Sequence, residues 1–389
     1  MRRAVVVGAG VAGLAAAGAL ARTRWRVTLL EQQPSLSLGR AGLLLWPNGV
    51  HALRGLGLGP GLDEIAEPVG ETVIRRPDGK VLARWSTAGL VERYGAPTLA
   101  LHRQDLYDAL VAELGDVEVH TGARISQVHT VGPGVPTVSD GHHSWEADLL
   151  VAADGINSVI RESIAPDSVV TPAGASAWRA VVPAHRVPTG VVAGETVGSG
   201  QRFLITPLGG RGVYWVAVVP GAPRPESPEV QLELLRRWFA GWHRPIQALI
   251  DATRPEELWQ QAMAELNPLP RRFGIAAERG GIALLGDAAH AMTPSLGQGA
   301  CLALEDAITL GTLLAEGVPG DPLDGVLSRY DRLRRRRTAK LVRQARRLGT
   351  LFGARSRIGV GARNTLLSAA PSSLLNRATA AGAGWRPPG

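Results

Sequence analysis

Three glycines near the start of the chain, Gly8, Gly10 and Gly13, constrain its fold more than any other feature. They follow a short apolar strand predicted over Ala4–Val7 and open an alanine-rich helix predicted over Val11–Arg22. In such a turn the first glycine permits the tight bend, the second lets the backbone approach a pyrophosphate, and the third lets the helix pack on the strand. The pattern therefore predicts a βαβ unit that binds a dinucleotide at the helix N-terminus.

A second strand, predicted over Arg26–Leu30, ends at Glu31, the place where a carboxylate accepts hydrogen bonds from a ribose. These features do not separate FAD from NAD, so both nucleotides stay open at this point. The same segment imitates a secretory signal, because Arg2 and Arg3 precede an uncharged stretch that reaches Ala21. The glycine spacing and the charged end of the second strand favour the nucleotide fold over export.

Beyond this unit the hydrophobic pattern alternates between strand and helix periods. Strands are predicted in 72–85, 117–120, 124–130, 148–152, 177–220 and 281–285, and helices in 51–56, 104–114, one long helix over 229–250, and from 299 and 323 onward. The expected fold class is α/β: a Rossmann-type nucleotide-binding domain, interrupted by a mostly antiparallel β-sheet domain and closed by C-terminal helices. We assign residues 1–70, 98–170 and 267–330 to the discontinuous first domain, 71–97 and 171–266 to a substrate-binding domain, and 331–389 to a C-terminal helical segment.

Two further motifs follow predicted strands. The first, DGINSVIR, spans 154–161, and the second, GDAAH, spans 286–290 and leads through Pro294 to a turn at Gly297–Gly299. Asp287 comes directly after an apolar strand, where its carboxylate can accept hydrogen bonds from the hydroxyls of a ribityl chain; an ordinary helix cap is the alternative. The Gly297–Gly299 turn starts a helix whose N-terminal dipole is available to negative charge.

In this order the three motifs resemble the class A flavin monooxygenases, the family of para-hydroxybenzoate hydroxylase and salicylate hydroxylase. The segment 154–161 looks like that family's DG motif, whose residues lie near both FAD and the nicotinamide cofactor. GDAAH, with Pro294 and Gly297–Gly299, looks like its second FAD fingerprint. The resemblance covers most of the chain and implies an FAD-binding domain, with NADH or NADPH as a transient electron donor.

The resemblance also implies a reaction: NAD(P)H and O2 hydroxylate or epoxidise a small aromatic or polyene-like substrate through a C4a-hydroperoxyflavin. Because the flavin carries the oxygen chemistry, no side chain is assigned as catalytic, and Pro294 and Gly297 are candidates only for lying near the flavin. Two alternatives remain at this stage. One is an FAD-dependent reductase of the same fold, and the other is a flavin-binding or membrane-associated protein without turnover.

The residues expected to bind the cofactor lie on turns, strand ends or helix starts. By resemblance, Arg103 in the segment LHRQDL matches the family arginine that reaches the FAD pyrophosphate, and Arg40 lies near the cofactor by a looser match. His290 and Cys301 are expected to be structural. The full expected set is Gly8, Gly10, Gly13, Glu31, Arg40, Arg103, Asp154, Gly286, Asp287, Gly297, Gln298 and Gly299.

Substrate residues are assigned by resemblance alone. Similar proteins use the strands after the DG motif as the ceiling of the substrate pocket, and Trp46 would border the flavin from another side. Arg202 and Tyr214 are similar to a pair that some relatives use to hold an acidic or phenolic ring. The candidates are Trp46, Trp178, Arg202 and Tyr214, with Arg179 in the same strand region. Ser295 stands where relatives often carry Asp or Asn, so no proton relay is assigned.

The single cysteine excludes an internal disulfide and a multi-cysteine metal site, and no zinc spacing is present, so we expect no metal and a cytoplasmic location. The net charge is +8, with a dense arginine run over 332–347. We interpret this run as the solvated face of a docking helix whose apolar positions include Leu333, Leu341, Val342 and Leu348. We expect a small-molecule substrate and O2 as partners, no nucleic acid or membrane contact, and a monomer or homodimer.

Overall fold

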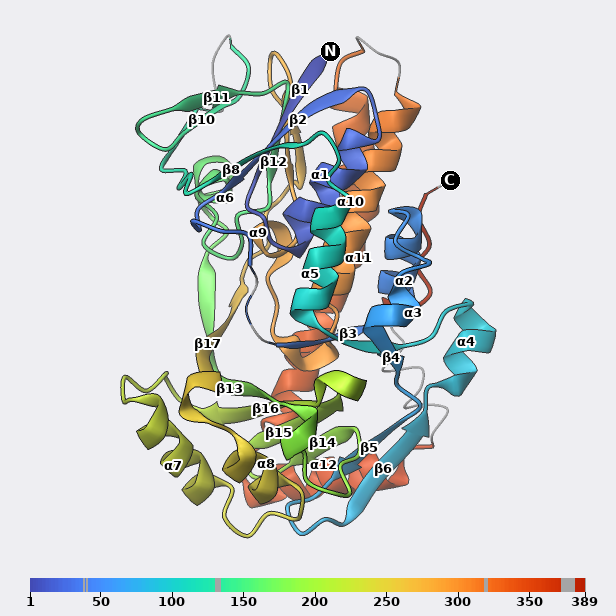
Figure 1. Cartoon of the computed structure of the whole chain (residues 1–389), viewed down its shortest axis with the longest axis vertical. Coiled ribbons are helices and arrows are strands. Elements are labelled where there is room, and N and C mark those ends of the chain that lie inside the picture. The colour runs from blue at the N-terminus through green and yellow to red at the C-terminus, as the bar shows by residue number, and fades with distance from the viewer. Residues whose placement is uncertain (38, 40, 130–133, 318–320, 372–381, 389) are drawn as a thin grey trace.

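The computed structural model describes residues 1–389 apart from 38, 40, 130–133, 318–320, 372–381 and 389. Two large sheets lie toward opposite ends of the long axis, and helix α11 (Asp324–Phe352) runs from one toward the other (Figure 1). Within the described residues, no helix combines the length and the apolar character needed to cross a membrane.

The first sheet carries the predicted βαβ unit. Its neighbours pair in parallel except at one edge, where β18 is antiparallel to β19. Because helices cover both faces of such a sheet, its central strands are continuous apolar runs, as in the wholly buried β12. The strand order is β18 (Gly274–Ala276), β19 (Gly281–Leu284), β12 (Leu149–Ala152), β1 (Arg2–Val7), β2 (Trp25–Glu31), β8 (Glu118–Thr121).

Helix α1 (Val11–Ala21) packs between this sheet and helix α10 (Gly299–Glu316). Small residues bring the two helices close, since a Cβ added to Gly311 would lie 2.8 Å from the Cβ of Ala19. The contact places the N-terminus of α1 and the N-terminus of α10 on the same side of the molecule (Figure 1).

The second sheet is antiparallel except where β14 pairs with β5. Helices α7 (Pro228–Trp238) and α8 (Ile246–Ala252) cover one face and bury a core that includes Phe203 and Trp215. The mixed α/β class with an antiparallel second sheet is therefore confirmed. The strand order is β17 (Trp259–Leu266), β13 (Val170–Val182), β16 (Val213–Pro220), β15 (Arg202–Pro207), β14 (Gly194–Val197), β5 (Glu71–Arg75), β6 (Val81–Ser86).

The single helix predicted over 229–250 was wrong. The chain forms α7 and α8 instead, separated by a turn that contains Gly241 in the left-handed region, with φ of 75°. Pro245 then precedes α8 and has no N–H group with which to continue a helix. Both helices bury apolar residues against the same sheet, so their combined apolar pattern resembles that of a single long helix.

Two three-stranded sheets accompany the two large ones. One three-stranded sheet has β7 (Leu99–His102) between β3 (Gly42–Leu45) and β4 (Ala66–Pro68), and the other has β10 (Thr137–Ser139) between β9 (Gln127–His129) and β11 (Ser144–Glu146). The remaining helices are α2 (Pro47–Gly55), α3 (Leu62–Ile65), α4 (Ala88–Tyr94), α5 (Arg103–Ala112), α6 (Val159–Ile164), α9 (Asp287–His290) and α12 (Arg357–Ala369).

Helix α11 crosses the boundary predicted at residue 331, so we propose to start the C-terminal segment at Asp324 and otherwise keep the predicted domains. The expected docking face was also wrong in part. Leu333 is 43% exposed, whereas Arg334 is fully buried. The reason lies in the acidic residues of α10, which draw arginines of α11 into the interior.

Candidate functional site

The turn between β1 and α1 has the geometry that the glycine spacing predicts. Gly8 lies in the left-handed region at φ of 98°, and its N–H donates to the Leu30 carbonyl at 2.7 Å. A Cβ added to Gly8 would overlap the carbonyl of Ala153, and one added to Gly13 would overlap the carbonyl of Gly8. Neither position tolerates a side chain, because strand and helix meet there without a gap.

Gly10 differs from its neighbours because a Cβ added there would meet no atom within 4 Å. It is the N-cap of α1, and the first hydrogen bond of the helix runs from the Leu14 N–H to the Gly10 carbonyl at 3.0 Å. The N–H groups of residues 11–13 therefore have no partner within the helix. The open space above Gly10 and these donors fit an anion such as a pyrophosphate.

Glu31 closes β2 beside this turn. Its Oε2 accepts the Ala9 N–H at 2.7 Å and its Oε1 accepts the Gln33 N–H at 2.8 Å. The carboxylate thus lies next to the glycine turn, where a ribose would follow the pyrophosphate.

The Gly286–Asp287 turn packs against the helix that follows the first glycine turn. Gly286 has φ of 58°, and a Cβ added there would lie 2.8 Å from the Cβ of Ala12 in α1. Asp287 follows as the exposed first residue of the short helix α9. The strand end that carries Asp287 is therefore held against the helix that carries the glycine turn.

A third turn leads into α10. Gly297 has φ of 61°, and its added Cβ would lie 3.4 Å from the indole nitrogen of Trp46. A Cβ added to Gly299 would meet nothing within 4 Å, as at Gly10. The first hydrogen bond of α10 runs from Leu302 to Gln298 at 2.9 Å, so the N–H groups of residues 299–301 have no partner within the helix. Pro294, which precedes the turn, is exposed.

Arg103 lies where the three turns approach the second sheet. It begins α5, and its N–H donates to the Ala41 carbonyl at 2.7 Å. Burial lowers the pKa of Arg103, the carboxylate of Asp287 opposes this shift, and Arg179 adds to it. Burial raises the pKa of Tyr214, against the opposing effect of Arg179 and Arg103. These four side chains therefore lie within electrostatic reach of one another.

Successive side chains of a strand point to opposite faces of the second sheet, so the neighbouring residues Trp178 and Arg179 lie on different faces. Trp178 is 2% exposed, donates its indole N–H to Gln231 of α7 at 3.0 Å, and belongs to the core under the helices. Its neighbour Arg179 points to the opposite face, that of Tyr214. The expectation that Trp178 lines the pocket is therefore wrong, and of the candidates in β13 only Arg179 lies on the face of Tyr214.

Arg202 reaches from the second sheet toward the third turn. Its Nε donates to Glu195 at 2.5 Å, and one terminal nitrogen lies 3.4 Å from the hydroxyl of Ser295. The guanidinium also lies over the ring of Phe352, 5.1 Å from its centroid. Arg202 is therefore already held by an acidic partner, in contrast to Arg179, whose buried Nε has no hydrogen-bond partner among the described residues.

Asp154 of the DG motif has a deeply buried carboxylate with only weak protein contacts. Within the described part of the chain neither oxygen accepts a hydrogen bond of regular geometry, although the Ser158 hydroxyl and nearby backbone N–H groups lie close to it. Burial raises the pKa of Asp154, which Ser158 and nearby backbone N–H groups lower to a smaller extent. Nearby, Arg161 donates to the Ile156 carbonyl at 2.6 Å, which closes the turn of the motif. An acceptor left unsatisfied beside a nucleotide turn fits a site completed by a bound cofactor.

We predict that Asp154→Asn stabilises the cofactor-free protein. Because burial raises the pKa of Asp154, its protonated form is favoured on folding, and the stability that it contributes at low pH is lost as the pH rises through that raised pKa. The gain in unfolding free energy at pH 8 should be about 1 kcal/mol for each pKa unit of the shift. Thermal unfolding at pH 8 and pH 4 measures it, and an equal effect at both pH values would contradict this account.

The side chain of Gln298 is 1% exposed. Its Oε1 accepts the Asn48 side-chain N–H at 2.9 Å, and its buried Nε2 has no hydrogen-bond partner among the described residues. Arg40 lies outside the described residues. The remaining members of the set lie on the three turns, at Glu31, at Arg103 and at Asp154.

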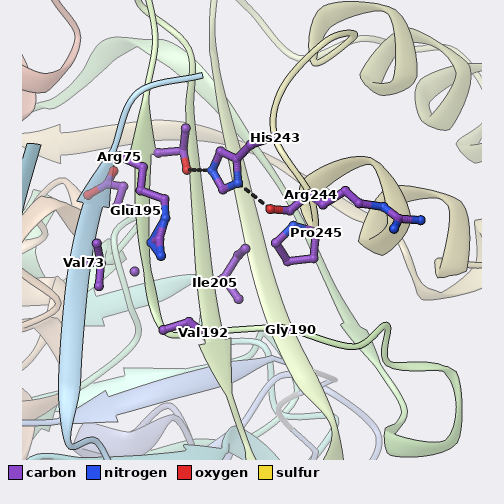
Figure 2. Close-up of a pocket in the computed structure, with 11 residues that line it drawn as sticks. Val73, Arg75, Gly190, Val192, Glu195, Ile205, His243, Arg244 and Pro245 are labelled. Atoms are coloured by element: carbon purple, nitrogen blue, oxygen red, sulfur yellow. Dashed lines mark hydrogen bonds between the residues drawn. The ribbon is translucent and has the colours of Figure 1, made fainter. Parts of the chain in front are cut away.

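A separate cavity of about 50 Å³ opens at the second sheet and is lined by Arg75, Glu195, Ile205 and His243, among others (Figure 2). His243 is fixed there, with Nε2 2.9 Å from the Thr196 hydroxyl and Nδ1 2.5 Å from the Arg244 carbonyl. The cavity is small, and none of the predicted site residues lines it. We therefore locate the site at the glycine turns.

Sequence reasoning missed a buried ionic cluster behind the site. Glu305 and Asp306 of α10 and Arg334 of α11 are all fully buried. His290 lies 2.6 Å from Asp306, which agrees with a structural role, and burial raises the pKa of the Cys301 thiol to about 12. Two adjacent acidic residues inside an otherwise apolar helix were the available signal, since acidic side chains are almost never fully buried unless paired.

Comparison with known proteins places the chain among FAD-binding proteins. The model of the FAD binding domain family matches residues 2–345. The chain is 35% identical to 3-amino-4-hydroxybenzoate 2-monooxygenase of Streptomyces cremeus, over 90% of this chain and 87% of that protein. It is 34% identical to 3-hydroxybenzoate 6-hydroxylase of Polaromonas naphthalenivorans, over 90% and 88%. The structure of HpxO from Klebsiella pneumoniae, complexed with FAD and uric acid, superposes with a TM-score of 0.86 at 28% identity, over 97% of this chain and 95% of that one.

Proposed function

The chain belongs to the family of single-component FAD-dependent aromatic hydroxylases, and from this premise we propose which residues hold its FAD and which kind of ring it oxidises. It is an FAD-dependent monooxygenase that uses NAD(P)H and O2. When bound, FAD accepts a hydride from the nicotinamide and activates O2 for transfer to the substrate. The protein's own groups bind FAD and the substrate, orient them and exclude water.

The observation that carries the proposal is the convergence of two open helix N-termini with an unsatisfied carboxylate. The N–H groups at Gly10 hold the FAD pyrophosphate, Arg103 adds a charge to it, and Glu31 accepts hydrogen bonds from the ribose. Asp287 accepts hydrogen bonds from the ribityl chain. The open N-terminus of α10 at Gly299 would stabilise negative charge on a bound, reduced flavin through its dipole.

The substrate that fits this site is an electron-rich aromatic ring with an acidic or hydroxyl substituent. The Arg179 guanidinium lies over the ring of Trp259, 5.2 Å from its centroid, and its buried Nε has no acceptor in the described parts of the chain, so it can receive an anionic group. Tyr214 and Arg202 lie on the same face of the sheet and can orient the ring. The relatives named for hydroxybenzoates and the HpxO complex with uric acid also point to acidic rings.

The face of the second sheet that carries Tyr214 also carries a cluster of apolar side chains. Val216, Val218 and Met263 from the second sheet pack in one buried cluster with Tyr214 and with Ala41 near the glycine turns. An apolar cover keeps water from the reacting ring, which favours transfer of oxygen to the substrate over its loss as peroxide. Trp46 borders the same region from the side of α2, next to Gly297.

A spectroscopic experiment tests the function. The purified protein should show a bound flavin spectrum that bleaches on anaerobic addition of NADH or NADPH, and an acidic aromatic compound such as a hydroxybenzoate should accelerate the bleaching. A protein that retains no flavin and binds no added FAD would contradict the proposal. A flavin that bleaches equally with and without every ring tested would contradict the proposed substrate class.

The oligomeric state and the cellular compartment are proposed on separate grounds. We propose a monomer or homodimer. We also propose that it works in the cytoplasm, because a single buried cysteine, Cys301, requires no oxidising compartment. Native mass determination and cell fractionation test both.

A further inference from the structure

Two adjacent acidic residues, Glu305 and Asp306, lie in the middle of α10 with their side chains fully buried. A carboxylate in a protein interior costs several kcal/mol unless cations and hydrogen-bond donors surround it. Groups from three neighbouring elements hold the pair, namely from α11, from α2 and from the turn that opens α9.

Arg334 of α11 contacts both carboxylates with one guanidinium. Its Nε lies 2.6 Å from Asp306 Oδ1, and a terminal nitrogen lies 2.6 Å from Glu305 Oε2. Its other terminal nitrogen donates to the Leu302 carbonyl at 3.3 Å, and the ring of Trp385 covers the guanidinium at 5.7 Å. A planar fork suits two neighbouring carboxylates, which a lysine ammonium cannot span in the same way.

From Asp306 the contacts continue to the Gly286–Asp287 turn. The second oxygen, Oδ2, accepts the Gly286 N–H at 2.9 Å and lies 2.6 Å from His290 Nε2. Gly286 directly precedes Asp287, whose carboxylate is proposed to bind the ribityl chain. Arg334 is therefore two contacts away from this turn, and the carboxylate of Asp306 is the link.

From Glu305 the contacts continue to the turn that opens α10. Its Oε1 accepts the Asn48 side-chain N–H at 2.6 Å, and the same nitrogen donates to Gln298 Oε1 at 2.9 Å. Asn48 is fully buried and belongs to α2, two residues after Trp46. Gln298 is the N-cap of α10. Arg337 also binds Glu305, at 2.6 and 2.7 Å, and supports this branch from α11.

We propose that Arg334 is a positioning residue for the cofactor, which holds the Gly286–Asp287 turn through Asp306 and the Gln298–Gly299 turn through Glu305 and Asn48. The inference rests on the proposed FAD site. Arg334 has no exposed surface and touches no part of that site itself, so it acts by fixing the two turns before FAD arrives. Groups behind the contacting residues commonly have this effect on bound ligands and metals.

The pKa shifts of Arg334 and Asp306 both favour the charged forms of these two side chains. Burial lowers the pKa of Arg334, but Glu305 and Asp306 raise it by more, so that the pKa is raised overall. Burial raises the pKa of Asp306, and His290 and Arg334 together bring it below its ordinary value. The cluster is consequently tested by substitution rather than by titration.

Three variants of the full-length protein test the inference. Arg334→Lys keeps the charge and removes the fork, and Asn48→Ala cuts only the branch to Gln298. The matched control is Arg329→Ala, which removes an exposed ion pair between the same two helices, Arg329 with Glu316. Two quantities are measured: the FAD Kd by fluorescence titration, and the hydrogen exchange of amides 286–290 and 297–302 in the cofactor-free protein.

Arg334→Lys should raise the FAD Kd about tenfold or more, the usual size for loss of a group behind the contacting residues. Exchange should become faster at both turns in Arg334→Lys and only at 297–302 in Asn48→Ala. Asn48→Ala should also weaken FAD binding, and Arg329→Ala should change neither quantity. Wild-type Kd and exchange in both test variants would overturn the inference.

If Arg334→Lys does not fold, Asn48→Ala decides alone, and an unchanged Kd with unchanged exchange at 297–302 overturns the inference. The proposed function fails in a different way, namely if the wild-type protein itself binds no FAD.

Discussion

Gly10→Ala should abolish measurable FAD binding while leaving the cofactor-free protein within about 1 kcal/mol of wild-type stability. The added Cβ meets no protein atom within 4 Å, and φ of −73° suits alanine, so the fold has no reason to change. The same Cβ occupies the space through which the pyrophosphate approaches the helix N-terminus. Fluorescence titration with FAD measures the first effect, and thermal unfolding measures the second.

Gly13→Ala is the matched comparison. Here the new Cβ overlaps the Gly8 carbonyl at the contact of strand and helix, so the variant should lose about 3 kcal/mol of stability or fail to fold. The two alanines thus separate a position reserved for the ligand from one reserved for packing. Wild-type FAD affinity in Gly10→Ala would show that no pyrophosphate lies at this turn.

Arg202→Ala should raise the substrate KM by roughly tenfold or more, because charged hydrogen bonds contribute about 1.5–3 kcal/mol. The variant should also lose about 3 kcal/mol of stability, since Glu195 keeps a nearly buried carboxylate without its partner at 2.5 Å. Steady-state kinetics of substrate-dependent NAD(P)H oxidation and thermal unfolding measure the two effects.

The double variant Arg202→Ala/Glu195→Gln separates the two roles of Arg202. It removes the unpaired carboxylate, so most of the lost stability should return while the KM stays high. A double variant with the KM of the wild type would show that Arg202 serves the ion pair alone.

The nucleotide turn could be predicted from sequence because its determinants are local. Gly8, Gly10, Gly13 and Glu31 lie within one βαβ unit. In the structure Gly8 and Gly13 leave no room for a Cβ, Gly10 borders open space, and the Glu31 carboxylate accepts the Ala9 N–H. The strand that ends before Asp287 was likewise readable from its apolar run. These features depend on residues that are close together in the sequence, so they can be recognised without the structure.

The misassigned residues depend on contacts far apart in the chain. Trp178 and Arg179 differ by one position, and only the pairing of β13 with β16 decides which of them faces the flavin side. Arg334 looked like one of many solvated arginines, because its partners, Glu305 and Asp306, belong to another helix. Such partners become visible only when the two helices are packed together.

The most direct test of the central claim is turnover under isotopically labelled O2 with NAD(P)H and an acidic aromatic substrate, followed by mass determination of the product. The account predicts one labelled oxygen atom in the ring product and NAD(P)H oxidation that depends on the substrate. NAD(P)H oxidation with no labelled oxygen in any product, across hydroxybenzoates and related acidic rings, would contradict it.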